Sequence, residues 1–208
     1  MRRPAQVQGR RAAEGQDKLD QLVETAAKLF ERHGYRGITV DEILRTVKFS
    51  KGGMYHRVRN KAELLYLSAR GAWDIVKSEV IDPVSQIDDP EAQLRALTLR
   101  HLELLVVKHK GGLTITSAHV SALTPAKRNE IISAEKRYIK FVAEIFERLR
   151  EQGKLREVKP TVAALNHLAM ILHAVRWYRP GGDLTPGEIA DEITRTTLVG
   201  VTRPVSPA

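Results

Sequence analysis

Apolar residues recur every three to four positions along most of the chain, the spacing that places side chains on one face of an α-helix. The first such stripe runs from Asp17 to His33, and Gly34 follows it as a helix stop. No segment shows the strict apolar–polar alternation that marks a half-buried strand. The pattern therefore predicts an all-α fold of about nine helices.

Three more helices are predicted close behind the first. Thr39–Glu42 is a capping box, in which a Thr and a Glu three positions later satisfy backbone N–H groups at a helix start. Ser50 is suited to cap a short third helix over Lys51–Arg57, and a second capping box at Asn60–Glu63 opens a fourth helix. Short helices joined by a tight turn are typical of a helix-turn-helix unit.

The rest of the chain repeats this pattern of starts and stops, with Pro or a capping box before each long helix and Gly after most ends. The predicted helices run from Asp89-Pro90 to Gly111-Gly112, over Leu113–Leu123, from Thr124-Pro125 to Gly153, over Thr161–Tyr178, and from Thr185 past Leu198. The helix over Thr161–Tyr178 is apolar nearly all round, so it must be buried on more than one side. We expect one side to meet a second subunit, together with the last helix; the alternative is a central helix in a monomer.

The distribution of charge indicates where a polyanion binds. The 208 residues have a formal net charge of +9. Residues 1–66 hold 14 Lys and Arg against 8 Asp and Glu, or +6, and the other 142 hold 20 against 17, or +3. A basic N-terminal segment followed by a nearly neutral remainder is typical of nucleic-acid-binding proteins. An ordinary basic surface is the alternative explanation of the net charge.

Four parts follow from these patterns. Residues 1–16 are expected to form a disordered basic arm, and 17–66 a DNA-binding domain whose fourth helix continues to about residue 80. Residues 81–202 are expected to form a helical ligand-binding and dimerisation domain, and 203–208 a polar tail. The absence of cysteine agrees with a reducing compartment. With no secretion signal and no apolar stretch long enough to span a bilayer, a soluble cytoplasmic protein without a membrane partner is expected.

No catalytic site, metal site or cofactor is expected. His101, His119, His167 and His173 lie in predicted helices, but no two of them have the i,i+4 spacing of a helical zinc site. The chain has no P-loop, no Gly-x-Gly-x-x-Gly and no Gly-x-Ser-x-Gly motif. An enzyme with an incidental basic head is a remote alternative, which substrate turnover would reveal.

The segment LVETAAKLFERHGYRGITVDEILRTVKFSKGGMYHRVRNKAELL carries a resemblance that covers about residues 19–65. Its Ala-rich first helix ending in Phe-x-x-x-Gly, its Ser-Lys-Gly-Gly-Met-Tyr-His recognition helix and its Asn-Lys-x-x-Leu opening resemble the DNA-binding domain of the TetR family of bacterial regulators. The resemblance implies a homodimer that binds double-stranded DNA at an inverted-repeat operator and responds to a small-molecule effector.

Candidate DNA contacts lie in this segment. Gly52 and Gly53 remove side chains where the recognition helix must approach DNA closely, and Lys51 can bind a guanine edge or a phosphate. The resemblance implies phosphate contacts for Tyr55 and His56. The full set is Thr39, Ser50, Lys51, Gly52, Gly53, Tyr55, His56, Arg57 and Lys61. Two departures from the family pattern are Lys48, where Gly is usual in the turn, and Arg57-Val58, where His-Phe is common.

A second resemblance lies at Arg176–Leu184, RWYRPGGDL, which is similar to a branch of the family that responds to acyl-CoA thioesters. It implies a repressor that an acyl-CoA of lipid or steroid catabolism releases from DNA, although the same residues suit a subunit contact. Candidate ligand residues, chosen from helical facing, are His101, Leu104, His119, Phe141, Leu168, Leu172, Arg176 and Trp177. A different hydrophobic effector, such as a drug or an aromatic compound, and an architectural DNA-binding protein without an effector are the remaining alternatives.

Overall fold

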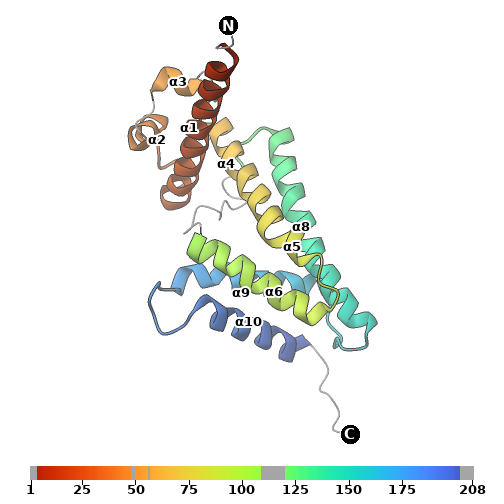
Figure 1. The fold of residues 1–208 in the computed structure, drawn as a ribbon. Helices are drawn as coiled ribbons and strands as arrows, with labels where there is room; N and C mark the ends of the chain where they lie inside the picture. Colours follow the sequence, from red (N-terminus) through yellow and green to blue (C-terminus); the bar gives the residue numbers. More distant parts are fainter. Residues whose placement is uncertain (1–3, 48–49, 56, 109–119, 202–208) are drawn as a thin grey trace. The chain divides into compact units, whose positions relative to one another are not determined.

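The computed structural model describes residues 4–47, 50–55, 57–108 and 120–201, with side chains from Asp17 onward (Figure 1). Every regular element in these ranges is a helix, which confirms the predicted all-α fold. The chain divides into two compact units. Residues 1–72 and 112–129 belong to the first unit, and residues 73–111 and 130–208 belong to the second.

The first unit contains α1 (Pro4–His33), α2 (Val40–Val47), α3 (Lys51–Tyr55) and most of α4 (Lys61–Val76). Its helices are held together by an apolar core made of Leu22, Ala26, Phe30, Ile43, Leu44, Met54, Val58, Leu64 and Leu65. The hydroxyl of Ser68 donates a hydrogen bond to the Val23 carbonyl, 3.1 Å away, and ties α4 to α1. Met54 is the buried residue of α3, so the other side chains of this helix stay available to solvent.

Helix α1 begins at Pro4, so the prediction of a disordered arm is wrong for residues 4–16. Proline is favoured in the first helical turn because its missing N–H has no intrahelical partner there. The residues after it are rich in Ala, Gln, Arg and Glu, which have high helix propensity. The packed part of α1 supplies the nucleus that a short isolated helix lacks. The prediction failed because apolar periodicity reports burial rather than helix formation.

The second unit begins at Trp73 on α4 and continues through a π-helical turn, η1 (Lys77–Ile81), and the short α5 (Asp82–Val84). Its other elements are α6 (Pro90–Glu103), a second π-helical turn η2 (Leu104–Lys108), most of α8 (Pro125–Glu151), α9 (Pro160–Trp177) and α10 (Pro186–Val201). Helices α6, α9 and α10 pack against one another (Figure 1). Two π-helical turns in one unit are unusual, because such turns are rare and occur most often at functional sites.

The predicted helix starts at Asp89 and Thr185 and the predicted stops at Gly34 and Gly153 are observed. The Asp89 carboxylate accepts a hydrogen bond from the Ala92 N–H at 2.8 Å, and the Thr185 hydroxyl accepts one from the Glu188 N–H at 3.2 Å. Gly34 and Gly153 follow α1 and α8 with φ of 72° and 70°, the left-handed conformation that ends helices and favours glycine.

Two segments differ from the sequence-based expectation. The helix that starts at Pro90 changes from α to π at Leu104, which periodicity does not distinguish. Residues 120–129, expected in the ligand-binding domain, group with the first unit. One reason is that the Lys127 ammonium lies 3.4 Å from the Glu63 carboxylate and 4.5 Å from the centre of the Tyr66 ring. Lys48, His56, His119, most of Leu113–Leu123 and the tail 203–208 lie outside the described residues.

Candidate functional site

The start of α2 is organised by the predicted capping box. The Thr39 N–H and hydroxyl both donate to the same Glu42 carboxylate oxygen at 2.7 Å, and the Glu42 N–H donates to the Thr39 hydroxyl at 3.2 Å. The hydrogen bonds from the Thr39 side chain and backbone lower the pKa of Glu42. Thr39 is exposed, so it can cap the helix and still lie where a phosphate would approach the helix N-terminus.

The recognition helix α3 is capped as predicted and presents small residues outward. The Ser50 hydroxyl accepts a hydrogen bond from the Gly53 N–H at 3.1 Å. A side chain at Gly52 would meet no atom within 4 Å, so packing within the protein does not require glycine at this position. Because glycine weakens a helix by about 1 kcal/mol, the absence of an internal reason indicates an external one: close approach of another molecule.

Lys51 does not extend freely from the recognition helix. Its ammonium lies 2.9 Å from the Asp41 carboxylate of α2, and this hydrogen-bonded pair raises the pKa of Lys51. Both side chains are more than half exposed, so solvent screens the ion pair and it is easily exchanged. A DNA phosphate or guanine edge would therefore compete with Asp41 for Lys51.

The start of α4 brings further cationic groups to the first unit. The Asn60 side chain accepts a hydrogen bond from the Glu63 N–H at 2.9 Å, and the Glu63 carboxylate accepts one from the Arg59 N–H at 2.8 Å. The Lys61 ammonium lies 4.5 Å from the centre of the Tyr35 ring, and partial burial lowers its pKa. Tyr55 and Arg57 are exposed. Thr39, Lys51, Tyr55, Arg57 and Lys61 therefore all lie on the first unit, at or near helix ends.

The second unit contains an aromatic–histidine cluster, formed by partly buried Trp73 of α4 and by buried His101 of α6 and Tyr138 of α8. The Tyr138 hydroxyl and His101 Nδ1 are 2.9 Å apart, and the two rings meet edge to face at 5.4 Å. Trp73 packs edge-on against Tyr138 with ring centres 6.0 Å apart. Burial lowers the pKa of His101 to about 4 and raises that of Tyr138, so both side chains are neutral at pH 7.

A second buried histidine joins three helices of the same unit. His167 of α9 lies 2.9 Å from the Thr98 hydroxyl of α6 through Nε2 and 2.8 Å from the Thr197 hydroxyl of α10 through Nδ1. The Thr194 hydroxyl lies 3.1 Å from that of Thr98. Burial, and to a lesser extent the charge of His101, lowers the pKa of His167 to about 4. These hydrogen bonds satisfy polar groups whose burial would otherwise be unfavourable.

The candidate ligand residues fall into two separate groups. His101, Leu104 and Leu168 are buried and Phe141 is partly buried, whereas Leu172, Arg176 and Trp177 face outward. His119 lies outside the described residues. The candidate ligand set did not include buried Tyr138 and His167 or partly buried Trp73. The spacing of Thr98 and His101, two polar residues one turn apart on an otherwise apolar stripe, was the available signal for a buried polar layer.

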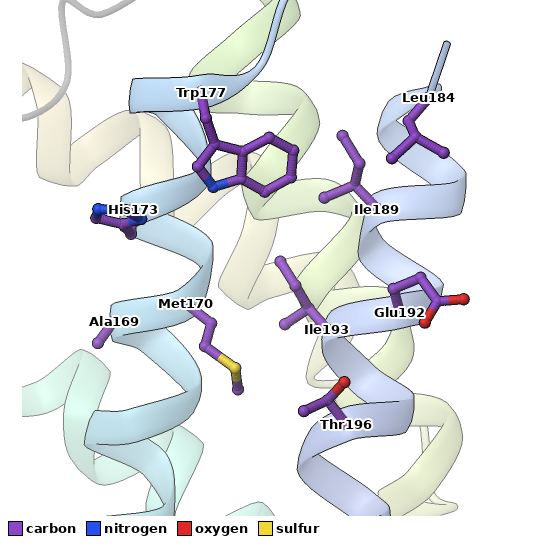
Figure 2. Close-up of a pocket in the computed structure, with 9 residues that line it drawn as sticks. All are labelled: Ala169, Met170, His173, Trp177, Leu184, Ile189, Glu192, Ile193 and Thr196. Carbon is purple, nitrogen blue, oxygen red and sulfur yellow. The ribbon is translucent and has the colours of Figure 1, made fainter.

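Of the outward group, Trp177 lines an apolar groove between α9 and α10 (Figure 2). The groove has a volume of about 560 Å³ and is lined by Ala169, Met170, His173, Trp177, Leu184, Ile189, Glu192, Ile193 and Thr196. Figure 2 shows Met170 and Trp177 of α9 and Ile189 and Ile193 of α10 directed toward the space between the helices. Val162, Leu165 and Leu172 extend the exposed apolar surface along α9.

Among the described residues, no group of three or more His, Cys, Asp or Glu side chains is arranged to hold a metal ion. Within the described ranges, no helix is long and apolar enough to cross a lipid bilayer.

Two family models match the chain. Residues 22–66 match the model described as bacterial regulatory proteins of the tetR family, and residues 87–201 match the tetracyclin repressor-like C-terminal domain. The chain belongs to the TetR family. Members of this family are transcriptional regulators, so the helix-turn-helix of the first unit is a DNA-binding element. The resemblance found in the N-terminal sequence is thereby confirmed.

Individual TetR-family proteins resemble almost the whole chain. AibR, crystallised with isovaleryl coenzyme A and operator DNA, is 33% identical, with a TM-score of 0.77 over 86% of this chain and 97% of AibR. The transcriptional repressor KstR2 of Mycobacterium tuberculosis strain H37Rv is 25% identical over 92% of this chain and 96% of its own length. PfmR of Thermus thermophilus is 26% identical, with a TM-score of 0.73 over 86% of this chain and 97% of PfmR.

Proposed function

We propose that this TetR-family regulator is a homodimeric repressor that an acyl-CoA thioester releases from an inverted-repeat operator. The observation that carries the proposal is the similarity to AibR, whose crystal structure holds both isovaleryl coenzyme A and operator DNA and which aligns with nearly the full chain. The RWYRPGG segment points independently to the same branch of the family. A regulator of bacterial genes works in the cytoplasm, which agrees with the absence of cysteine.

DNA recognition is assigned to α3 and to the starts of α2 and α4. The exposed Lys51, the open position at Gly52 and Tyr55 on α3 suit insertion into the major groove. Thr39 and Lys61 lie at helix N-termini, where backbone N–H groups and the helix dipole favour phosphate. Ser50 and Gly53 shape the start of α3, Arg57 adds charge beside it, and His56 completes the proposed set.

Dimerisation is assigned to the outward face of α9 and α10. Val162, Leu165, Leu172 and Trp177 on α9 and Leu184 before α10 each expose 45% to 49% of their surface. Several large apolar side chains exposed side by side on one face of a domain indicate a protein–protein contact. A second copy with its own α9 and α10 is the occupant, because two heads related by a two-fold axis are needed to read an inverted repeat.

The experiment measures how tightly the protein binds the DNA upstream of its own gene and random DNA of equal length. Each binding measurement is repeated with isovaleryl-CoA, with free CoA and with isovaleric acid. Operator binding should weaken with isovaleryl-CoA and stay unchanged with free CoA or the free acid. Release by the free acid alone would contradict the thioester assignment. If none of these compounds releases the DNA but a drug or an aromatic compound does, the assignment as a repressor stands and the proposed effector is wrong. Equal affinity for random DNA, without release, would instead favour an architectural protein.

A further inference from the structure

The ring of Tyr35 lies beneath the ammonium of Lys61, one of the assigned phosphate contacts. Tyr35 belongs to the turn between α1 and α2, and the Lys61 ammonium at the start of α4 lies over the ring face, 4.5 Å from its centre. A cation over an aromatic face is attracted by the negative potential of the ring. Both side chains are partly buried, so water screens this contact less than it screens an exposed ion pair.

The Tyr35 ring is fixed to the core of the first unit. It meets the fully buried ring of Phe30 on α1, with ring centres 5.6 Å apart and the planes tilted by 44°. The turn that carries Tyr35 is closed tightly against α1, because a side chain at Gly37 would meet the His33 carbonyl oxygen at 2.1 Å. Tyr35 is therefore a rigid support for a lysine side chain that would otherwise sample many rotamers.

The contact with Tyr35 leaves the positive charge of Lys61 available to DNA. Burial raises the pKa of Tyr35, so its ring is neutral at pH 7 and does not cancel the ammonium charge. Lys51 differs, because its ammonium is paired with the Asp41 carboxylate at 2.9 Å. A phosphate that binds Lys51 must displace this carboxylate, whereas a phosphate that binds Lys61 meets a cation held by a neutral ring.

The Glu42 carboxylate connects Lys61 with Thr39, a second assigned phosphate contact. It accepts two hydrogen bonds from Thr39, at 2.7 Å each. Burial lowers the pKa of Lys61, and the Glu42 charge raises it to a lesser extent. The N-termini of α2 and α4 therefore lie within electrostatic range of each other. Both helix dipoles and the fixed ammonium favour an anion at these two helix starts.

We propose that Tyr35 is a positioning residue for DNA binding, which holds the Lys61 ammonium in place so that it meets a backbone phosphate without further ordering. This assignment rests on the proposed phosphate contact of Lys61. Ordering a long side chain on association is unfavourable, and a contact that already orders it in the free protein removes part of that cost. Since phosphates carry no sequence information, Tyr35 contributes to the affinity for operator and random DNA alike.

The principal test removes the ring and keeps the lysine. Tyr35→Leu should weaken binding to operator and random DNA by roughly threefold per protomer, or about tenfold per dimer, measured by fluorescence anisotropy. Tyr35→Phe keeps the ring face and should bind within about twofold of the wild type. A loss in Tyr35→Phe equal to that in Tyr35→Leu would assign the effect to the hydroxyl and overturn the proposal. Tighter binding by Tyr35→Leu would also overturn it, because the ring would then withdraw Lys61 from DNA.

A double-mutant cycle separates positioning from general loosening of the fold. If Tyr35 acts through Lys61, Tyr35→Leu should change DNA affinity by less than about twofold in the Lys61→Ala background. Losses that multiply in the double variant would overturn the proposal. If Lys61→Ala weakens binding and Tyr35→Leu does not, the positioning role alone is wrong. If Lys61→Ala leaves DNA affinity unchanged, the phosphate contact of Lys61 is wrong, and the role of Tyr35 fails with it.

Tyr66→Leu is the matched control. The Lys127 ammonium lies 4.5 Å from the centre of the Tyr66 ring, the same distance as in the Tyr35 contact and in the same unit. Lys127 is paired with Glu63 at 3.4 Å and has no assigned DNA contact. Tyr66→Leu removes an equivalent contact and should leave DNA affinity within about twofold of the wild type. A loss equal to that in Tyr35→Leu would show general loosening of the first unit, and the specific assignment to Tyr35 would fail.

Discussion

Leu172 offers a direct test of the dimer face, because its side chain lies in the exposed apolar stripe of α9. It is 45% exposed in the single chain, so about half of its burial energy remains to be gained on association. Full burial of a leucine side chain contributes about 1.5–3 kcal/mol, so the exposed half corresponds to roughly 1 kcal/mol. A two-fold interface buries two copies, and Leu172→Ala should therefore weaken dimerisation by about 2 kcal/mol, or roughly 30-fold.

A charged residue at the same position should have a larger effect. Leu172→Asp places two unpaired carboxylates in the interface and should give a monomer at micromolar concentration, measured by sedimentation velocity. Val107→Ala is the matched control, because Val107 is 50% exposed on η2 and does not line the α9–α10 groove. The monomeric variant should keep its helical content and lose its preference for operator over random DNA. A Leu172→Asp protein that sediments as a dimer would refute the assignment of this face.

Three further predictions concern charge. Lys61→Ala should weaken binding to all DNA sequences alike and flatten the log–log salt slope by roughly two units per dimer, measured by fluorescence anisotropy; an unchanged slope would exclude a phosphate contact. Asp41→Asn should tighten binding to all DNA severalfold at low salt because it removes a negative charge and frees Lys51, and weaker binding would contradict this. Stability should fall from about pH 6.5 toward pH 4, because the unfolded chain binds protons that neutral, buried His101 and His167 exclude; urea midpoints that stay constant down to pH 5 would refute this.

The sequence predicted the first unit well because its helix boundaries are set locally. The Thr39 and Asn60 caps each depend on residues within three or four positions, and both are observed. The same holds for the glycine that ends α1. Residues 4–16 were missed because they form a helix without an apolar stripe, and the prediction used that stripe as its signal.

The second unit was predicted less completely because its interior hydrogen bonds join distant segments of the chain. Tyr138 and His101 lie 37 positions apart, and Thr98 and His167 lie 69 apart, so no local pattern pairs them. Helical facing correctly placed His101 and Leu168 in the interior. Helical facing also assigned exposed Leu172 to the candidate ligand pocket, because a helix that is apolar on all sides does not reveal which side faces inward. The change from α to π helix at Leu104 also alters the facing of residues beyond it.

The energy needed for release constrains where the switch lies. A hundredfold loss of operator affinity requires about 2.7 kcal/mol of coupling between effector and DNA. Lys108 of η2 and Glu79 of η1 form an ion pair, but their side chains are 54% and 36% exposed, and such pairs contribute at most about 1 kcal/mol. The buried Tyr138–His101 hydrogen bond offers more, because breaking it would leave a buried polar group without a partner, which costs about 1–3 kcal/mol. A ligand that keeps this buried hydrogen bond in one state of the second unit and breaks it in another can therefore supply most of the required coupling.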